Sequence, residues 1–295
     1  MLHIKNSKGD NLFYVSNAAL LIIFMLIVLL PLLNVLVCSF SDPMEVARGN
    51  VLLLPKKITL EGYKAVIDYP GIWTAYGNTI FYTIVGTMIN LAMTLSIAYA
   101  ISREGVPFRG TIAGLFVFTM MFSGGMIPNY ILMKDLHLLN TRLAMLLPGA
   151  ISVYNMMLAR TFIQGIPQEL WEAAEIDGCS EIRFFFKMVL PLSVTLIAVL
   201  ALYYAVGHWN GYFDAFLYLT DSDKMPLQIK LRAILVANSI DENFIGDEES
   251  REARQNLADL LKYSLIIVSS VPVLVLYPFV KKHFIKGVML GSLKG

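Results

Sequence analysis

Six long stretches of the chain are apolar and contain no Asp, Glu, Lys or Arg. They cover approximately residues 13–37, 77–101, 111–133, 143–159, 188–213 and 263–280. An α-helix rises 1.5 Å per residue, so about 20 residues cross a hydrocarbon core of roughly 30 Å. A charged side chain at the bilayer centre costs about 3 kcal/mol even on the lenient insertion scale, so uncharged stretches of this length are typical of membrane helices. The pattern predicts an all-α polytopic membrane protein with six transmembrane helices.

The composition supports this class and excludes others. Hydrophobic residues make up 57% of the 295-residue chain, charged residues only 15%, and the mean hydropathy is +0.64. Soluble domains carry about 25% charged residues. A net charge of +1 gives no excess of cations for a nucleic-acid partner. Cys38 and Cys179 belong to no Cys-x-x-Cys or Cys/His cluster, so no metal site is expected.

Several of the six stretches contain residues that interrupt helices. The stretch 143–159 is short and contains Pro148, which predicts a broken or tilted helix. Pro272 and Pro278 predict a kink in 263–280. Ser123, followed by two glycines and then Pro128, predicts local loosening within 111–133.

Basic residues favour a topology with both termini in the cytoplasm. Short basic pieces at 103–109 and 281–286 adjoin the apolar stretches on the side that would hold the termini. We therefore expect a cytoplasmic segment 1–12, a membrane domain 13–280 and a cytoplasmic tail 281–295, in a multi-pass protein of the cell membrane. The acidic residues of 241–252 would then lie outside the cell.

The connection 166–187, called here the coupling segment, is predicted to form two short helices. Pro167 suits a helix start, and Glu169 lies in the first turn, where a carboxylate complements the helix dipole. Gly178 ends this helix, and Ser180 starts the next. Ala173, Ala174 and Gly178 are expected to leave one side of the turn nearly bare, so a partner backbone could approach closely. The alternative is an amphipathic connector that lies on the lipid surface.

Glu172-Ala173-Ala174, Asp177-Gly178 and Leu190-Pro191 resemble, at these spacings, the EAA signature of binding-protein-dependent ABC importer permeases. Met188, at an Ile-like position, and Cys179, where the family usually has Ala, depart from the pattern. The likeness covers nearly the whole chain, which looks like the second permease subunit of an oligosaccharide importer.

The resemblance implies that Glu172, Ala173, Ala174, Asp177 and Gly178 form the contact through which an ATPase drives the bundle. It also implies a heterodimer with a second, homologous permease, two cytoplasmic ABC ATPase subunits and an external solute-binding protein. Lipid bilayer and carbohydrate are the other expected partners. The sequence has no Gly-Lys dipeptide and hence no Walker A loop. The chain is therefore expected to be a non-catalytic subunit without a cofactor of its own, with ATP and Mg in the partner ATPase.

Polar and aromatic side chains within the predicted helices are candidates for contacts with a sugar in the transport pathway. The candidates are Asn78, Tyr82, Ser123, Asn129, Tyr130, Asn155, Trp209 and Asn210. For each of them the alternative is a helix–helix hydrogen bond or an interfacial aromatic.

Other classes of membrane protein compete with the importer. Coupled secondary transporters usually need ionisable groups in the membrane, and the apolar stretches offer only His208. We expect His208 to form a polar helix–helix contact. An intramembrane enzyme would need paired carboxylates, an activated nucleophile or a metal cluster at membrane depth. A channel or a membrane scaffold without transport activity would explain the apolar stretches but not the coupling segment.

Overall fold

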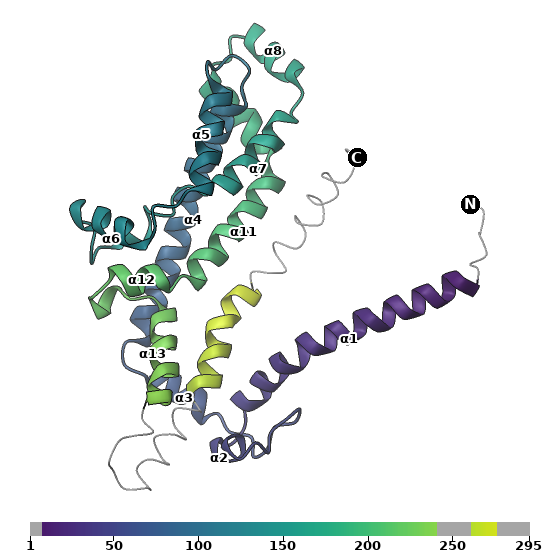
Figure 1. The fold of residues 1–295 in the computed structure, drawn as a ribbon, viewed down its shortest axis with the longest axis vertical. Helices are drawn as coiled ribbons and strands as arrows, with labels where there is room; N and C mark the ends of the chain where they lie inside the picture. The colour runs from purple at the N-terminus through teal and green to yellow at the C-terminus, as the bar shows by residue number, and fades with distance from the viewer. Residues whose placement is uncertain (1–7, 241–260, 276–295) are drawn as a thin grey trace. The chain divides into compact units, whose positions relative to one another are not determined.

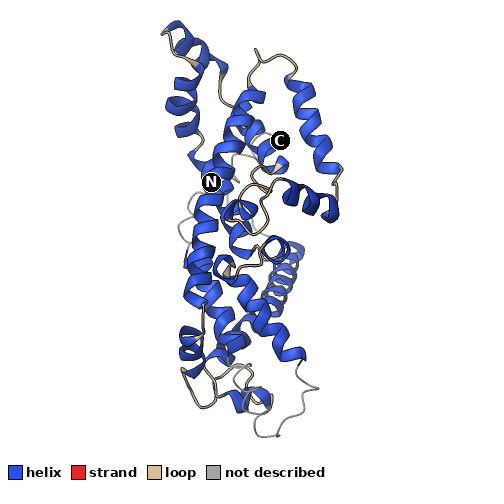
Figure 2. Ribbon diagram, turned by 90° about the vertical axis from the view of Figure 1, so that its left-hand side faces the viewer, coloured by secondary structure: helices blue, strands red, loops and turns tan. Residues whose placement is uncertain are grey.

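The computed structural model describes residues 8–240 and 261–275. All regular structure within these two ranges is helical (Figures 1 and 2). The chain forms two compact units, one from residues 1–69 and 231–270 and the other from residues 70–230 and 271–295.

The described part of the first unit begins with one long helix, α1 (Lys8–Ser39). Two short helices follow, α2 (Pro43–Ala47) and α3 (Glu61–Asp68). Asn34 of α1 donates hydrogen bonds to the backbone oxygens of Val51 and Leu52, at 3.2 and 2.8 Å. These bonds attach the connection after α2 to the end of α1.

The second unit is built around α4 (Ile72–Ser102), which packs along α7 (Val153–Gln164) and α11 (Val194–Asn210). Buried residues recur three or four positions apart on each of the three helices, as expected where helices pack together. The core residues are Leu95, Ala98 and Ile101 on α4, Met156, Ala159 and Ile163 on α7, and Leu196, Leu200 and Tyr204 on α11.

Polar pairs also join these helices. His208 of α11 lies 2.6 Å from the side-chain oxygen of Asn90 on α4, and the hydroxyls of Thr94 and Tyr204 are 2.7 Å apart. Asn90 also donates to the backbone oxygen of Gly149. The helix–helix contact expected for His208 is confirmed.

Within residues 8–240 and 261–275, two helices are long and apolar enough to cross a membrane, over Gly9–Ser39 and Ile72–Ser102. They contain the predicted stretches 13–37 and 77–101. Two bent helix pairs would add a crossing each, and Leu261–Val275 is a shorter apolar helix. That helix contains Pro272, whereas Pro278 lies outside the described residues.

The stretch 111–133 is not one continuous helix. α5 (Arg109–Met121) and α6 (Met126–Asp135) meet at an angle of 113°. The break contains Gly125, whose φ of +86° lies outside the helical region. The loosening predicted at Ser123 is therefore present as a sharp bend.

Proline breaks two more of the predicted stretches. In 143–159, a 3₁₀ turn η1 (Arg142–Met145) and an irregular segment around Pro148 precede α7. In 188–213, a π-helical turn η2 (Phe185–Val189) and the short α10 (Leu190–Leu192) precede an 81° bend into α11. Pro191 lacks an amide hydrogen and its ring crowds the preceding turn, which explains the widened helix at this point.

Several short helical elements complete the second unit. They are α8 (Gln168–Ile176), α9 (Glu181–Phe184), α12 (Phe213–Tyr218), η3 (Ser222–Lys224) and the start of α13 (Leu227–Ile240).

Candidate functional site

The coupling segment forms two helices around Gly178, as the sequence predicts. Pro167 occupies the N-cap of α8, and Asp177 is its C-cap. Gly178 has φ +72°, and the next amide, that of Cys179, donates to the Ala174 oxygen at 2.9 Å. A glycine in the left-handed region is the common way to end a helix, because other L-residues are strained there. The Ser180 hydroxyl then caps α9 by accepting from the amide of Arg183, at 3.4 Å.

One face of α8 packs inward. Trp171 contacts the ring of Phe184 edge-on, with ring centroids 4.8 Å apart. Ala174 and Cys179 also pack against the core of the second unit. This corrects one expectation, because Ala174 does not share the bare side of the turn with Ala173. The residues i and i+3 of a helix lie on one side, so Ala174 follows Trp171 toward the core.

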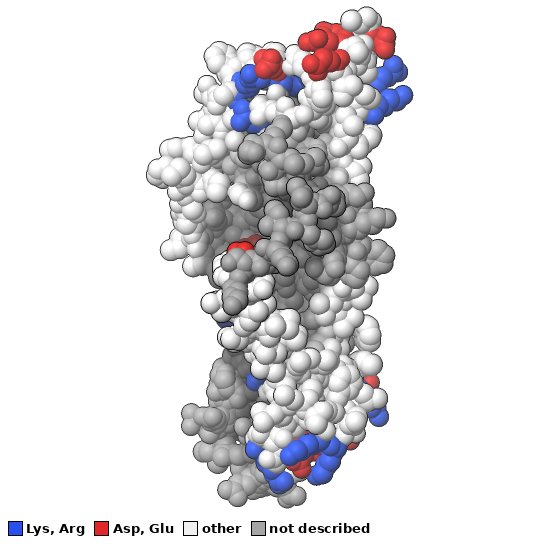
Figure 3. Space-filling view, turned by 90° about the vertical axis from the view of Figure 1, so that its right-hand side faces the viewer, with Lys and Arg blue, Asp and Glu red and all other residues white. Residues whose placement is uncertain are grey.

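The opposite face of α8 is exposed and mixes acidic with apolar groups. Ile176 is 87% exposed, and Ile182, just beyond the turn, is 73% exposed. The acidic residues of α8 and its C-cap are exposed as well, namely Glu169, Glu172, Glu175 and Asp177. On the face seen in Figure 3, charged side chains gather at the α8 end of this unit. We call Glu172, Ala173, Ile176, Asp177, Gly178 and Ile182 the outer face of the coupling segment.

Both halves of the coupling segment are attached to the end of α4. The guanidinium carbon of Arg103 lies 3.9 Å from the ring centroid of Trp171, a cation–π geometry. Its Nε lies 3.5 Å from a carboxylate oxygen of Glu181, whose other oxygen accepts a hydrogen bond from the Tyr99 hydroxyl. Trp171 belongs to α8 and Glu181 to α9. Sequence reasoning used Arg103 only for topology and missed this cluster, because the partners lie about 70 or more residues away along the chain.

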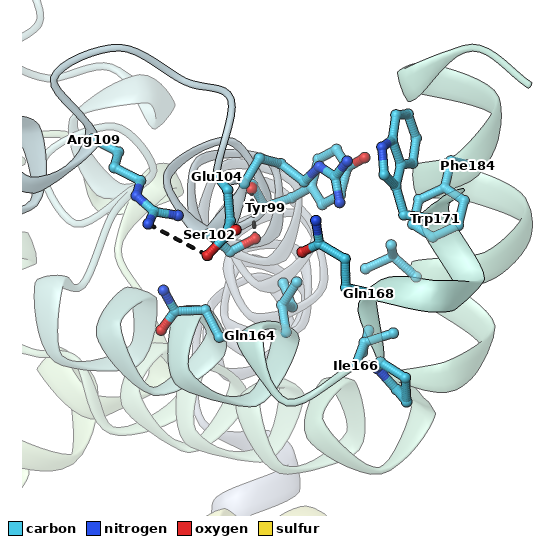
Figure 4. Close-up of a pocket in the computed structure, with 13 residues that line it drawn as sticks. Tyr99, Ser102, Glu104, Arg109, Gln164, Ile166, Gln168, Trp171 and Phe184 are labelled. Atoms are coloured by element: carbon cyan, nitrogen blue, oxygen red, sulfur yellow. Dashed lines mark hydrogen bonds and ion pairs between the residues drawn. The ribbon is translucent and has the colours of Figure 1, made fainter. Parts of the chain in front are cut away.

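A cavity of about 310 Å³ lies beside this cluster. Figure 4 shows Trp171 and Phe184 on one side of it and Tyr99 and Ser102, from the end of α4, on another. Arg109 pairs with Glu104 across the α4–α5 turn, at 3.6 Å. This second ion pair does not involve the coupling segment.

Two of the candidates for the substrate pathway hold a loop. The buried Asn78 amide donates to the backbone oxygens of Asp223 and Met225, at 2.7 and 3.2 Å. The buried Tyr82 hydroxyl donates to the oxygen of Lys224, at 2.8 Å. Within this loop, hydrogen bonds from the Asp223 amide and then from Lys224 lower the pKa of the Asp221 carboxyl.

The remaining candidates are spread over several elements. Trp209 is buried and meets Tyr76 edge-on, and Asn155 is buried in the first turn of α7. Tyr130 stacks on Tyr218, with centroids 6.4 Å apart. Ser123, Asn129 and Asn210 are exposed.

A second cavity, of about 210 Å³, lies along α4 and α11. Its polar lining includes Tyr82, Asn90, Tyr204, His208 and Asp214. Tyr82 alone among the eight candidates lines this cavity, so the structure does not gather them at one place. Their assignment to the pathway stays a prediction.

Comparison with known proteins places these features in a family. Residues 69–288 match the family model described as binding-protein-dependent transport system inner membrane component. Protein LplC of Bacillus subtilis is 40% identical over 98% of this chain and 97% of its own length. A polygalacturonan/rhamnogalacturonan transport system permease protein of the same organism is 39% identical over 99% of this chain and its full length.

A solved structure agrees over a similar range. A chain of a bacterial ABC transporter involved in the import of the acidic polysaccharide alginate superimposes with a TM-score of 0.86 and 34% identity. The match covers 95% of this chain and 99% of that one. The chain is therefore an integral membrane protein that belongs to the family of binding-protein-dependent transport system inner membrane components.

Proposed function

We propose that this chain is one permease subunit of an ABC importer for an oligosaccharide. Its similarity to a polygalacturonan/rhamnogalacturonan permease and to an alginate importer, in each case over nearly its full length, supports this substrate class. Alginate is acidic, so acidic oligosaccharides are the first substrates to test.

The proposed membrane arrangement has six crossings, with both termini in the cytoplasm. The two long helices, the two bent pairs and the apolar helix Leu261–Val275 support five of these. The irregular segment before α7, together with α7 itself, would form the other. Broken helices are common in transporters where the backbone lines a cavity or is buried in protein.

The observation that carries the mechanism is the outer face of the coupling segment. An 87% exposed isoleucine close in sequence to Gly178 and to several exposed carboxylates suits a protein partner with an apolar pocket and a basic rim. We propose that the cytoplasmic ATPase is this partner. ATP and Mg would bind to the ATPase alone, and its closure would move the coupling segment and switch the bundle between inward-facing and outward-facing states.

Further subunits follow from this arrangement. A second permease would complete the translocation path, and an external solute-binding protein would deliver the sugar to the side that carries the Asn78-held loop.

The test is reconstitution of the complex in proteoliposomes with its binding protein. Oligosaccharides, acidic and neutral, are added one at a time, and ATP hydrolysis and uptake are measured. We expect one class to stimulate hydrolysis and to accumulate only with ATP. Uptake that persists without ATP would instead indicate a secondary transporter or channel, and a chain that copurifies with no ATPase would indicate a scaffold.

A further inference from the structure

We propose that Arg103 is a positioning residue that locks both halves of the coupling segment to α4, so that movement of the segment is passed to the membrane helices. This inference rests on the proposed function and adds the point at which force enters the bundle.

The geometry joins three elements at one side chain. Arg103 follows the last residue of α4, and its side chain is only 20% exposed. The guanidinium carbon lies 3.9 Å from the ring centroid of Trp171 on α8, and Nε lies 3.5 Å from a carboxylate oxygen of Glu181 on α9, an ion pair without a hydrogen bond. Tyr99, one turn earlier on α4, holds Glu181 through its hydroxyl.

A lever needs this kind of attachment. A Cβ atom at Gly178, between α8 and α9, would meet nothing within 4 Å, so the turn itself adds no side-chain packing between the two helices, which touch through Trp171 and Phe184. If apolar packing were the only link between the two halves, part of a displacement of the outer face would be absorbed by rotation at the Gly178 turn. Because Arg103 contacts a residue from each half, the two helices and the end of α4 move together.

The end of α4 is the effective place to apply this movement. Ile101 and Ala98 lie within the last turns of α4 and belong to the core shared with α7 and α11. Arg160 of α7 also donates to the backbone oxygen of Ile101, at 3.3 Å. Displacement of Arg103 is therefore transmitted to the helix around which the second unit is packed.

Arginine suits this position better than lysine. The planar guanidinium can lie flat on the indole while its edge faces a carboxylate, whereas an ammonium group is a point charge without a face. Replacement by lysine keeps the charge but loses the stacked, two-sided contact.

The experiment compares variants of the full complex in proteoliposomes. The ratio of sugar transported to ATP hydrolysed is measured for Arg103→Ala, Arg103→Lys and Trp171→Phe, together with copurification of the ATPase. We expect Arg103→Ala to keep the ATPase bound but to lower the ratio by roughly 5-fold or more, within the range of typical coupling energies. Arg103→Lys should recover only part of the loss.

Arg109→Ala is the matched control. It removes an arginine that lines the same cavity and forms its ion pair with Glu104, a carboxylate outside the coupling segment. Its ratio should equal that of the unmodified complex. If Arg103→Ala does not assemble, the milder Arg103→Lys and Trp171→Phe decide, and ratios equal to that of Arg109→Ala would overturn the inference. Failure of the unmodified complex to bind an ATPase would contradict the proposed function instead.

Discussion

Gly86 of α4 makes room for the imidazole ring of His208 on α11. A Cβ atom at position 86 would come closer than 3.0 Å to several atoms of that ring. Asn90, one turn along α4, holds the same ring at 2.6 Å. The helix contact thus depends jointly on an absent side chain and on a polar partner four residues later.

Gly86→Ala should destabilise the packing of α4 on α11. The added methyl group forces His208 away from Asn90, and overpacking of this kind costs about 1–3 kcal/mol. The thermal stability of the purified complex measures the effect. Gly77→Ala is the control, because Gly77 lies on the same helix and a Cβ there would meet nothing within 4 Å. Equal stability of the two variants would contradict this account of the His208 contact.

Asn78→Ala should loosen the loop at 222–226. The substitution leaves the Asp223 and Met225 oxygens without their donor, and each lost buried partner costs about 1–3 kcal/mol. We expect lower thermal stability and faster proteolysis of this loop. Asn210→Ala is the control, because exposed Asn210 donates to Val206 of its own helix and not to this loop among the described residues. Equal thermal stability and equal proteolysis of the two variants would refute the loop-holding role of Asn78.

Gly178→Val should reduce ATPase coupling without preventing membrane insertion. At φ +72° a β-branched residue is strained by roughly 1–2 kcal/mol or more, so the turn would open. Gly178→Asn tolerates this conformation. Sugar-stimulated ATP hydrolysis by assembled complexes separates the two effects. If ATP hydrolysis is lost in Gly178→Val but not in Gly178→Asn, the geometry of the turn matters. If it is lost in both variants, the partner needs the open space at Gly178. Undiminished hydrolysis in both variants would count against the coupling role.

Ile176→Glu should release the ATPase from the permease. The change puts a charge at the centre of the proposed apolar contact and adds to an already acidic surface, so we expect a loss of about 2 kcal/mol or more of binding free energy. The amount of ATPase that copurifies is the measurement. Ile58→Glu is the control, since Ile58 is 74% exposed and lies in the connection after α2. Equal recovery of the ATPase with Ile176→Glu and Ile58→Glu would contradict the proposed contact at Ile176.

Local signals explain why the coupling segment was predictable. Pro167, Gly178 and Ser180 act on the backbone within a few residues, so their effect is written in consecutive positions of the sequence. The direction of Ala174 was not predictable in the same way. It depends on the phase of α8, which Trp171 fixes by packing on Phe184.

For the bent helices, too, the sequence predicts one part of the structure and packing decides another. Pro148 and the glycines at 124 and 125 indicate interruptions within 143–159 and 111–133, but not their angles, whereas 188–213 is expected to be one helix and its bend is not predicted. The angles of 113° and 81° depend on packing around each break, which no local signal encodes.

By itself the sequence determined that the chain enters a membrane, where two of its apolar stretches are interrupted and which short segment carries the family signature. These properties follow from hydrophobicity, missing amide hydrogens and turn-forming residues, all of which act locally. Only the tertiary structure decided that Asn78 and Tyr82 hold a loop about 140 residues away, that Gly86 admits His208, and that Arg103 joins both halves of the coupling segment. Such contacts join positions far apart in the chain, and they arise only when packing brings the helices that carry them together.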